Sequence, residues 1–361
     1  MKVAIITWHN YPNFGSALQA YALHAFINSR GGDATLVNYV PGQKEKLRRF
    51  RIIASYFDRM LPYSLSKRLH YRFLSFARRE FRLTRLFTKK EQLSQLNNEF
   101  DVFICGSDQI WAPNVLNEVY LLDFVDDAKK KISYAASIGL PVIPEEKKPI
   151  YQHFLSRFSA IALREEQGAE LLKNEFGIEP KVVLDPTLLL RKTDWEKIMR
   201  KNKLCKRLKG QYILCYFLGQ SESHRKLVEE VAKSTGLKVI ALSRFAVDSR
   251  EQFIVDSDAG PREFLGYIHD AALVITDSFH GLCFSINLNK NFYVVKRFSE
   301  NDPINQNSRI LNILSKVNLT NRLIDSTPSC VQSINYSEVN QLLDNLREYS
   351  IDYLIKNKII N

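Results

Sequence analysis

Long hydrophobic runs and closely spaced cysteines are both missing from this sequence of 361 residues. No uninterrupted apolar stretch approaches the roughly 18–20 residues that cross a bilayer, so a transmembrane protein is excluded. The apolar run at the N-terminus is too short for a signal peptide and is typical of a first β-strand. The five cysteines lie at least ten residues apart. This spacing favours reduced thiols in the cytoplasm over a disulfide framework or a zinc site.

Several motifs of common enzymes are also absent. The chain has no Walker loop and no GxGxxG, HExxH or GxSxG motif, which removes the commonest nucleotide-binding, zinc-protease and hydrolase functions. The Asp-Ser-Asp run at 256–258 matches the DxD metal motif of some glycosyltransferases, but three residues match often by chance. We therefore predict no metal site. A hydrophobic content of 45% and a charged content of 25% exclude a disordered or fibrous chain.

Positive charge is concentrated in one segment. The formal charge is +12, and residues 44–90 hold 15 Lys or Arg against 3 Asp or Glu, so the remainder is neutral overall. Basic and apolar residues alternate there, as in amphipathic helices that lie on anionic membranes. A helical insertion that packs on its own domain explains the pattern nearly as well. Nucleic-acid binding is not predicted, because no recognised motif accompanies the charge.

Short β-branched apolar runs alternate with helix-length periodic stretches along the chain. This alternation predicts parallel sheets covered by helices, an α/β fold. The expected strands are Val3–Thr7, Thr35–Tyr39, Val102–Cys105, Lys131–Ala135, Ala160–Leu163 and Lys181–Leu184, followed by Tyr212–Phe217, Lys238–Leu242, Leu273–Thr276 and Phe292–Val295. The helical patterns of the second series lie at His224–Ser234, Arg262–His269 and Gly281–Asn287.

Two such series predict two Rossmann-like domains that face a cleft. We expect an N-terminal α/β domain over 1–190, with a basic helical insertion at 44–90, and a second α/β domain over 191–335. The amphipathic stretch within 336–361 predicts a C-terminal helix that closes the structure. Open α/β sheets bind ligands where strands end and helices begin, so the side chains at those junctions are the strongest site candidates.

At the first junction, a loop leads from the first strand into a helix expected from about Ser16. Its candidate ligand-binding residues are His9, Asn13 and Gln19. Asn13 would bring a free N–H group to a ligand, and Gln19 would point into the cleft from the first helical turn. A tight turn with an N-cap explains Gly15 and Ser16 without any ligand.

The second junction, 106–113, ends a buried strand with a carboxylate, an amide and an aromatic ring. Asp108 and Gln109 would hydrogen-bond sugar hydroxyls, Trp111 would stack on a pyranose face, and Asp108 would take a proton from an attacking hydroxyl. An Asp N-cap with a core tryptophan is an equally good interpretation.

The third junction follows the strand at 273–276 and opens a helix. Backbone N–H groups of Ser278, Phe279, His280 and Gly281 would favour a phosphate, which His280 would protonate or hydrogen-bond. A lone histidine is often structural, but its place at the start of a helix favours function here.

Two arginines are candidates for fixed positive charge in the cleft. Arg164 follows an expected strand, and Arg309 opens a helix after the polar run 305–308. Arginine suits bidentate binding of carboxylate or phosphate. An ordinary surface ion pair, for example with Glu165 or Glu166, explains either arginine taken singly.

Taken in order, six short motifs resemble those of the polysaccharide pyruvyl transferase family. They are Asn13-Phe-Gly-Ser-Ala-Leu-Gln-Ala-Tyr-Ala-Leu23, Gly106-Ser-Asp-Gln-Ile-Trp111, Ala162-Leu-Arg-Glu165, Leu184-Asp-Pro-Thr187, Gly260-Pro-Arg-Glu-Phe264 and Ser278-Phe-His-Gly281. The resemblance implies a two-domain fold like that of the GT-B glycosyltransferases. It also implies phosphoenolpyruvate as donor and co-substrate, a sugar as acceptor, and a pyruvate ketal as product, with no cofactor.

The resemblance makes His280 the donor-site histidine and Arg164 a donor-binding arginine, with the donor in the second domain and the acceptor in the first. The candidate donor-binding residues are Arg164, Ser278, Phe279, His280, Gly281 and Arg309. The candidate acceptor-binding residues are His9, Asn13, Gln19, Asp108, Gln109 and Trp111. We expect His280 to act as acid or phosphate partner, and Asp108 as the base for the acceptor hydroxyl.

The chain departs from the family at one loop. Characterised members often carry Arg-Leu-His where this sequence has Ser278-Phe279-His280, so a phosphate would need another cation. The available candidates are Arg164, Lys296, Arg297 and Arg309.

The expected acceptor is a lipid-linked oligosaccharide of capsule or exopolysaccharide assembly, met at the inner face of the cell membrane through residues 44–90. A GT-B glycosyltransferase that uses a nucleotide sugar, and a non-catalytic scaffold that binds glycan or membrane, are the alternatives.

Overall fold

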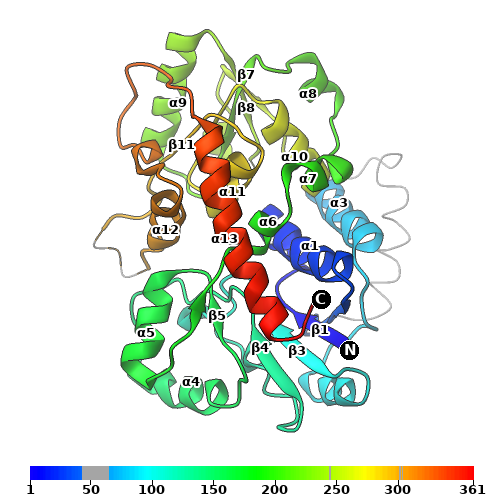
Figure 1. Ribbon diagram of the computed structural model, residues 1–361. Coiled ribbons are helices and arrows are strands. Elements are labelled where there is room, and N and C mark those ends of the chain that lie inside the picture. The colour runs from blue at the N-terminus through cyan, green and yellow to red at the C-terminus, as the bar shows by residue number, and fades with distance from the viewer. Residues whose placement is uncertain (43–64, 244, 301, 303) are drawn as a thin grey trace.

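The computed structural model describes residues 1–361 except 43–64, 244, 301 and 303 (Figure 1). Two parallel sheets stand one above the other, with helices on both faces and the C-terminal helix running across both (Figure 1). The expected α/β class with two Rossmann-like domains is confirmed.

The N-terminal sheet has the strand order β2-β1-β3-β4. Its strands are β1 (Lys2–Ile6), β2 (Asp33–Leu36), β3 (Val102–Cys105) and β4 (Lys130–Ser133). Isolated bridges from Ile132 to Ala160 and from Ala136 to Leu163 extend it toward the short pair β5 (Ala162–Leu163) and β6 (Lys181–Val182). Strand β3 is buried throughout, as the uninterrupted apolar run at 102–105 requires.

The C-terminal sheet has the strand order β11-β10-β7-β8-β9. Its strands are β7 (Tyr212–Tyr216), β8 (Lys238–Ala241), β9 (Phe253–Val255), β10 (Leu273–Thr276) and β11 (Phe292–Val294). Strand β9 was not expected, because its three residues are too few to show a period. The expected boundary near residue 190 falls between the last strand of the first sheet and the first strand of the second.

Helices cover both sheets. They are α1 (Phe14–Ser29), α3 (Leu65–Glu80), α4 (Lys148–Leu155), α5 (Glu166–Phe176), α6 (Pro186–Leu189), α7 (Lys192–Ile198), α8 (Lys203–Arg207), α9 (Glu222–Thr235), α10 (Pro261–Asp270), α11 (Phe279–Asn287), α12 (Ser308–Lys316) and α13 (Tyr336–Lys356). The 3-10 turns are η1 (Lys90–Asn98), η2 (Pro113–Val115), η3 (Glu118–Leu121), η4 (Glu145–Lys147), η5 (Ala246–Asp248) and η6 (Thr320–Arg322). Among the described helices, none is long and apolar enough to cross a membrane.

Helix α1 begins two residues earlier than expected, because Asn13 and not Ser16 is its N-cap. The Asn13 side chain accepts a hydrogen bond of 3.1 Å from the Ser16 N–H. This bond satisfies one of the N–H groups that the first helical turn leaves without a partner.

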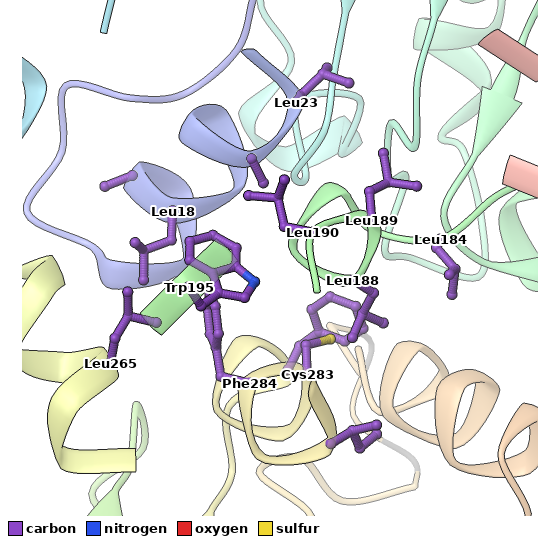
Figure 2. Close-up of a cluster of buried hydrophobic side chains, with 14 of the residues drawn as sticks. Leu18, Leu23, Leu184, Leu188, Leu189, Leu190, Trp195, Leu265, Cys283 and Phe284 are labelled. Atoms are coloured by element: carbon purple, nitrogen blue, oxygen red, sulfur yellow. The ribbon is translucent and has the colours of Figure 1, made fainter. Parts of the chain in front are cut away.

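One hydrophobic core continues from the first sheet into the second. At its centre, Trp195 lies among leucines of α1 and α6 and above Phe284 of α11 (Figure 2). The indole is fully buried, 5.7 Å from the Tyr21 ring and 4.9 Å from the Phe284 ring. The two sheets are therefore joined by a packed apolar interface and not by a flexible linker alone.

Helix α13 links the same two sheets. Tyr353 donates to the Ser133 carbonyl at 2.9 Å, while Arg347 donates to the Leu188 carbonyl at 2.7 Å and to Asn287 Oδ1 at 3.1 Å. Through these contacts, the C-terminal helix packs across both sheets.

The basic segment at 44–90 is described only from residue 65 onward. In α3, the apolar residues Leu69, Phe73 and Phe76 are buried in the shared core. On its charged side, Arg72 pairs with Asp258 at 2.6 Å and with Glu263 of α10 at 3.4 Å. The apolar face of α3 is thus used inside the protein, as in the interpretation of residues 44–90 as a helical insertion that packs on the protein itself. Residues 44–64 lie outside the described residues.

Candidate functional site

A cavity of about 500 Å³ lies between the two domains, at the carboxyl ends of both sheets. The loops after β1 and β3 supply one wall, and the loops after β7 and β10, with the start of α12, supply the other. Ligands of open α/β sheets bind at such strand ends, and the volume lies within the roughly 300–1,000 Å³ of small-molecule sites.

Two arginines give the second-domain wall a positive charge. Arg309 and Arg297 both line the cavity, and both donate to Gln306 Oε1, at 2.8 and 3.4 Å. A neutral amide oxygen thus accepts from both arginines. The carboxylate of Asp277, on the same wall, accepts from the Leu218 and Gly219 N–H groups at 2.6 and 2.8 Å. Within the described residues, Arg309 has no carboxylate within 4.0 Å, so its charge is available to an anionic ligand.

Burial disfavours the charged form of the Arg309 side chain. Its side chain is 7% exposed, and this burial, together with the charge of Arg164, lowers the pKa of Arg309 to about 9. The guanidinium is still protonated at neutral pH. A buried cation without a paired anion is costly, and an anionic ligand would relieve that cost.

His280 reaches the cavity from the first turn of α11. Its Nε2 lies 3.7 Å from Asp185 Oδ2, and its ring packs so closely on Gly15 that a Cβ there would lie 2.0 Å from Nδ1. Glycine at position 15 therefore makes room for the histidine of the other domain.

Asp185 is the centre of a buried polar network between the domains. It accepts from Arg164 Nη1 at 3.0 Å, from Ser107 Oγ at 3.1 Å and from the Thr187 N–H at 2.9 Å. Burial alone would raise the pKa of Asp185, but the neighbouring ring of His280 and the charge of Arg164 hold that pKa well below its ordinary value. This carboxylate stays ionised.

Asp108 lines the cavity from the loop after β3. It has a positive φ of 77°, and its carboxylate accepts from Ser16 Oγ at 2.6 Å and from the Gln109 N–H at 2.9 Å. Arg164 Nη1 is 3.9 Å away. The strained backbone and these donors fix the carboxylate at the cavity wall, in the position of an acceptor for a substrate proton.

Aromatic rings form the opposite, first-domain wall. Trp8 meets Tyr11 and Tyr120 at ring-centroid distances of 6.3 Å each and near-perpendicular angles. All three residues line the cavity. The cavity therefore has one cationic wall and one aromatic wall.

The structure brings half of the expected acceptor-binding residues to the cavity. Asn13, Asp108 and Gln109 line it. The expected sugar-stacking role of Trp111 is not supported, because its indole is 0% exposed and donates to the Tyr120 carbonyl. Trp111 is the core aromatic of the alternative interpretation.

Gln19 and His9 also lie away from the cavity lining. Gln19 is fully buried and donates to Thr7 Oγ1 and to the Trp8 carbonyl, so it shapes the loop after β1. His9 is buried too, and its Nδ1 lies 3.1 Å from the Thr7 carbonyl. The prediction that Gln19 and His9 bind the acceptor directly is therefore wrong. Both side chains support the loop after β1 instead.

Of the expected donor-binding residues, Ser278, Phe279, His280 and Arg309 line the cavity, whereas Gly281 and Arg164 do not. The Gly281 N–H is capped by Ser278 Oγ at 3.3 Å, and the Ser278 N–H is bonded to Thr276 Oγ1 at 3.0 Å. The prediction that these two N–H groups bind an anion is thus wrong, because both already donate hydrogen bonds to side-chain oxygens.

Arg164 lies behind the cavity. Its guanidinium stacks on the Phe279 ring at 4.4 Å, with Arg309 5.8 Å from the same ring. Burial alone would lower the pKa of Arg164, but the charges of Asp185, Glu165 and Asp108 raise it. Arg164 therefore pairs with carboxylates and positions Phe279, while Arg309 is the arginine that faces a ligand.

A sequence profile of the family described as polysaccharide pyruvyl transferase matches residues 13–297. This match covers every strand of the two sheets except β1. The cavity residues outside it are Trp8, Tyr11, Phe298, Gln306, Asn307, Arg309 and Ile310. The chain belongs to the polysaccharide pyruvyl transferase family. No functionally curated protein matches it significantly.

Solved structures share the fold of this pyruvyl transferase family member at low identity. A putative UDP-N-acetylglucosamine 2-epimerase from Listeria monocytogenes is 13% identical, with 96% of this chain and 88% of that chain covered and a TM-score of 0.52. The UDP-GlcNAc 2-epimerase from Neisseria meningitidis is 12% identical over 99% and 100% of the chains, with a TM-score of 0.51. An α-glucosyltransferase in complex with UDP is 10% identical over 99% and 93%, with a TM-score of 0.51. These likenesses confirm the GT-B-like fold.

Sequence reasoning missed several residues of this pyruvyl transferase site. Trp8 and Tyr11 flank the singled-out His9, but nothing in a loop sequence shows which side chain turns outward. Gln306 lies in the polar run before Arg309. Only the folded structure shows that its side-chain oxygen accepts from both arginines. Asp185 stood within a family motif without an assigned role.

Proposed function

We propose that this family member transfers the enolpyruvyl unit of phosphoenolpyruvate onto two hydroxyls of a sugar in a surface-polysaccharide precursor, forming a pyruvate ketal. The observation that carries the proposal is Arg309, a buried cation without a carboxylate partner among the described residues, in the same cavity as His280 and Asp108. Phosphoenolpyruvate carries a phosphate and a carboxylate, and Arg309 with Arg297 would meet these charges.

The donor then needs a proton at C3. His280, which lies beside Asp185, delivers it, and C2 acquires oxocarbenium character. The first sugar hydroxyl attacks C2 and passes its proton to Asp108. The C2–O bond to phosphate then breaks, and the leaving phosphate takes the proton that Asp108 accepted. The second hydroxyl closes the ketal, and its proton replaces the one that His280 gave. Together, phosphoenolpyruvate and the diol yield the ketal and hydrogen phosphate, so atoms and charge balance.

Thermal stability with and without donor tests the donor site first. We expect millimolar phosphoenolpyruvate to raise the melting temperature more than phosphate alone does, and Arg309→Ala to abolish the difference. Lys233→Ala, on the far helix α9, is the control and should respond as the wild type does. Stabilisation by a nucleotide sugar and not by phosphoenolpyruvate would move the assignment to glycosyl transfer. Binding of oligosaccharide alone would indicate a scaffold.

Phosphate release from phosphoenolpyruvate in the presence of sugar acceptors tests the chemistry. His280→Ala and Asp108→Asn should each lower the rate by about 10²–10⁴-fold, as expected for loss of a general acid or base. If both variants keep near-wild-type rates, the assigned roles of these residues are wrong.

The proposed acceptor is lipid-linked and the proposed location is the cytoplasm, at the inner face of the membrane. The net charge of +12 over residues 44–90 supports contact with anionic lipid. Flotation with vesicles of anionic and of neutral lipid tests it. Equal recovery with both vesicle types at low salt would remove the membrane role of this segment.

A further inference from the structure

The aromatic wall of the cavity has no part in donor binding or proton transfer. It consists of Trp8 and Tyr11, from the loop after β1, and of Tyr120, on η3. It lies across the cavity from Arg309 and Arg297, which would hold the anionic donor. A polar, charged donor would gain little from this wall, because an aromatic face favours apolar C–H groups.

Three of the ten exposed large hydrophobic residues in the described part of the chain line the cavity. Tyr11 is 54% exposed, Val115 48% and Leu218 37%, and all three line the cavity. Large apolar groups exposed together in a concave site mark a binding surface. The Tyr11 ring packs against Trp8 in a T-shaped contact. More than half of the Tyr11 surface remains exposed to a ligand.

Polar groups adjoin these rings. Asp108, Gln109 and Asn117 line the same cavity, and their carboxylate and amide groups suit hydroxyls. A ligand that fits both sets of groups has a ring with an apolar face and with hydroxyls around its edge. A pyranose has both features.

We propose that Trp8 and Tyr11 form the platform on which the acceptor pyranose packs its apolar face, with its hydroxyls turned toward Asp108 and Gln109. This inference rests on the proposed function, whose acceptor it places. It assigns sugar contact to residues of the loop after β1 in place of the buried Trp111.

The three tryptophans of the chain provide a direct measurement. Trp111 and Trp195 are both 0% exposed, and only Trp8 lines the cavity. Emission changes on adding a sugar therefore report Trp8. The probes are the methyl glycosides of glucose, galactose, mannose and their N-acetylated 2-amino forms, titrated into the full chain without phosphoenolpyruvate.

We expect at least one glycoside to change the emission and to show saturation transfer from the protein to its ring C–H protons. Trp8→Phe should remove the emission change. Tyr11→Ala should weaken binding about five- to tenfold, as for loss of one aromatic contact. Because Tyr11 is more than half exposed, its removal leaves the core intact. Tyr349→Ala, an equally exposed tyrosine on α13 outside this cavity, should bind as the wild type does.

No binding by any glycoside, or unchanged affinity in Tyr11→Ala, would overturn the platform. In the phosphate-release assay, Tyr11→Ala should raise the KM for the sugar and leave the KM for phosphoenolpyruvate unchanged. Sugar binding without turnover of phosphoenolpyruvate would contradict the proposed function and spare the platform. Turnover with an unchanged sugar KM in Tyr11→Ala would contradict the platform alone.

Discussion

At the scale of single residues, Asp185 decides how the site is assembled. One carboxylate holds Arg164 and Ser107 of the first domain and lies beside His280 of the second. Asp185 therefore positions the candidate acid without lining the cavity itself. A carboxylate beside a histidine holds its ring in place.

The Asp185→Asn variant should keep the shape of this network and lose its charge. We expect the rate of phosphate release to fall by about 10²-fold, because the ring of His280 loses the carboxylate that lies beside it. The free energy of unfolding should fall by about 3 kcal/mol, since Arg164 loses its nearest partner. The rate of phosphate release is the measurement, and Glu348→Gln, at an exposed carboxylate on α13, is its control. An unchanged rate would contradict the positioning role.

His24 makes the stability of the fold depend on pH. It is 8% exposed on α1, and both of its ring nitrogens are buried without a hydrogen-bond partner among the described residues. Burial, with a contribution from Arg82, lowers the pKa of His24 to about 4. The unfolded chain, in which its pKa is near 6.5, therefore binds the proton more readily.

Stability should consequently fall as the pH drops from about 6.5 to 4, because protons favour the unfolded chain. The wild type should lose about 3 kcal/mol more than His24→Leu over this interval. Urea unfolding at several pH values gives this difference, and subtracting the two proteins removes the contributions of other groups. Parallel curves for the two proteins would show that His24 does not titrate in this way.

At the scale of elements, α3 packs against both domains. Phe73 stacks on Phe14 at 5.5 Å between ring centroids, and Phe14 stacks on Phe264 of α10 at 4.5 Å. The charged side of α3 adds the pairs of Arg72 with Asp258 and Glu263. The periodic apolar pattern of this segment thus reflects an internal face.

Phe73→Ala should lower the free energy of unfolding by about 3 kcal/mol, because it removes a buried ring and leaves a cavity. Arg79→Ala, on the exposed side of the same helix, should change it by less than about 0.5 kcal/mol. Urea denaturation measures both. If Phe73→Ala has full stability and instead loses binding to anionic vesicles, this face of α3 serves the membrane.

At the scale of the whole molecule, the two domains share one core. The cluster around Trp195 (Figure 2) and the crossing of α13 (Figure 1) join them. Closure of the cavity around two substrates would therefore have to bend at this interface. The shared core also makes separate unfolding of one domain expensive, because it would expose apolar surface of the other.

The domains should therefore unfold in a single transition. In a Trp8→Phe background, Trp195→Phe leaves Trp111 as the reporter of the first domain, and Trp111→Phe leaves Trp195 as the reporter of the interface. Both variants should show midpoints in urea that agree with their own far-ultraviolet circular dichroism. A circular dichroism curve with two steps in either variant would mean that the domains unfold separately.

The sequence alone determined the fold class, most strands and the three loops that meet at the site. Periodicity is a local property, and β3 and β10 lie where the apolar runs at 102–105 and 273–276 place them. Helix starts were less well determined: α1 begins at its Asn13 cap, because a side-chain hydrogen bond and not periodicity sets the first turn. Asp108, His280 and Arg309 were identified as site residues because each follows a strand or opens a helix.

Which side chain of each loop faces the cavity was decided only by the tertiary structure. Trp111 and Trp8 are both aromatic residues after a strand, yet packing against neighbouring elements buries Trp111 and brings Trp8 to the cavity. Arg164 and Arg309 look alike in sequence, but within the described part of the chain only Arg164 has buried carboxylates within 4 Å. Burial and charge pairing depend on residues far away in the chain, and the folded arrangement alone fixes them.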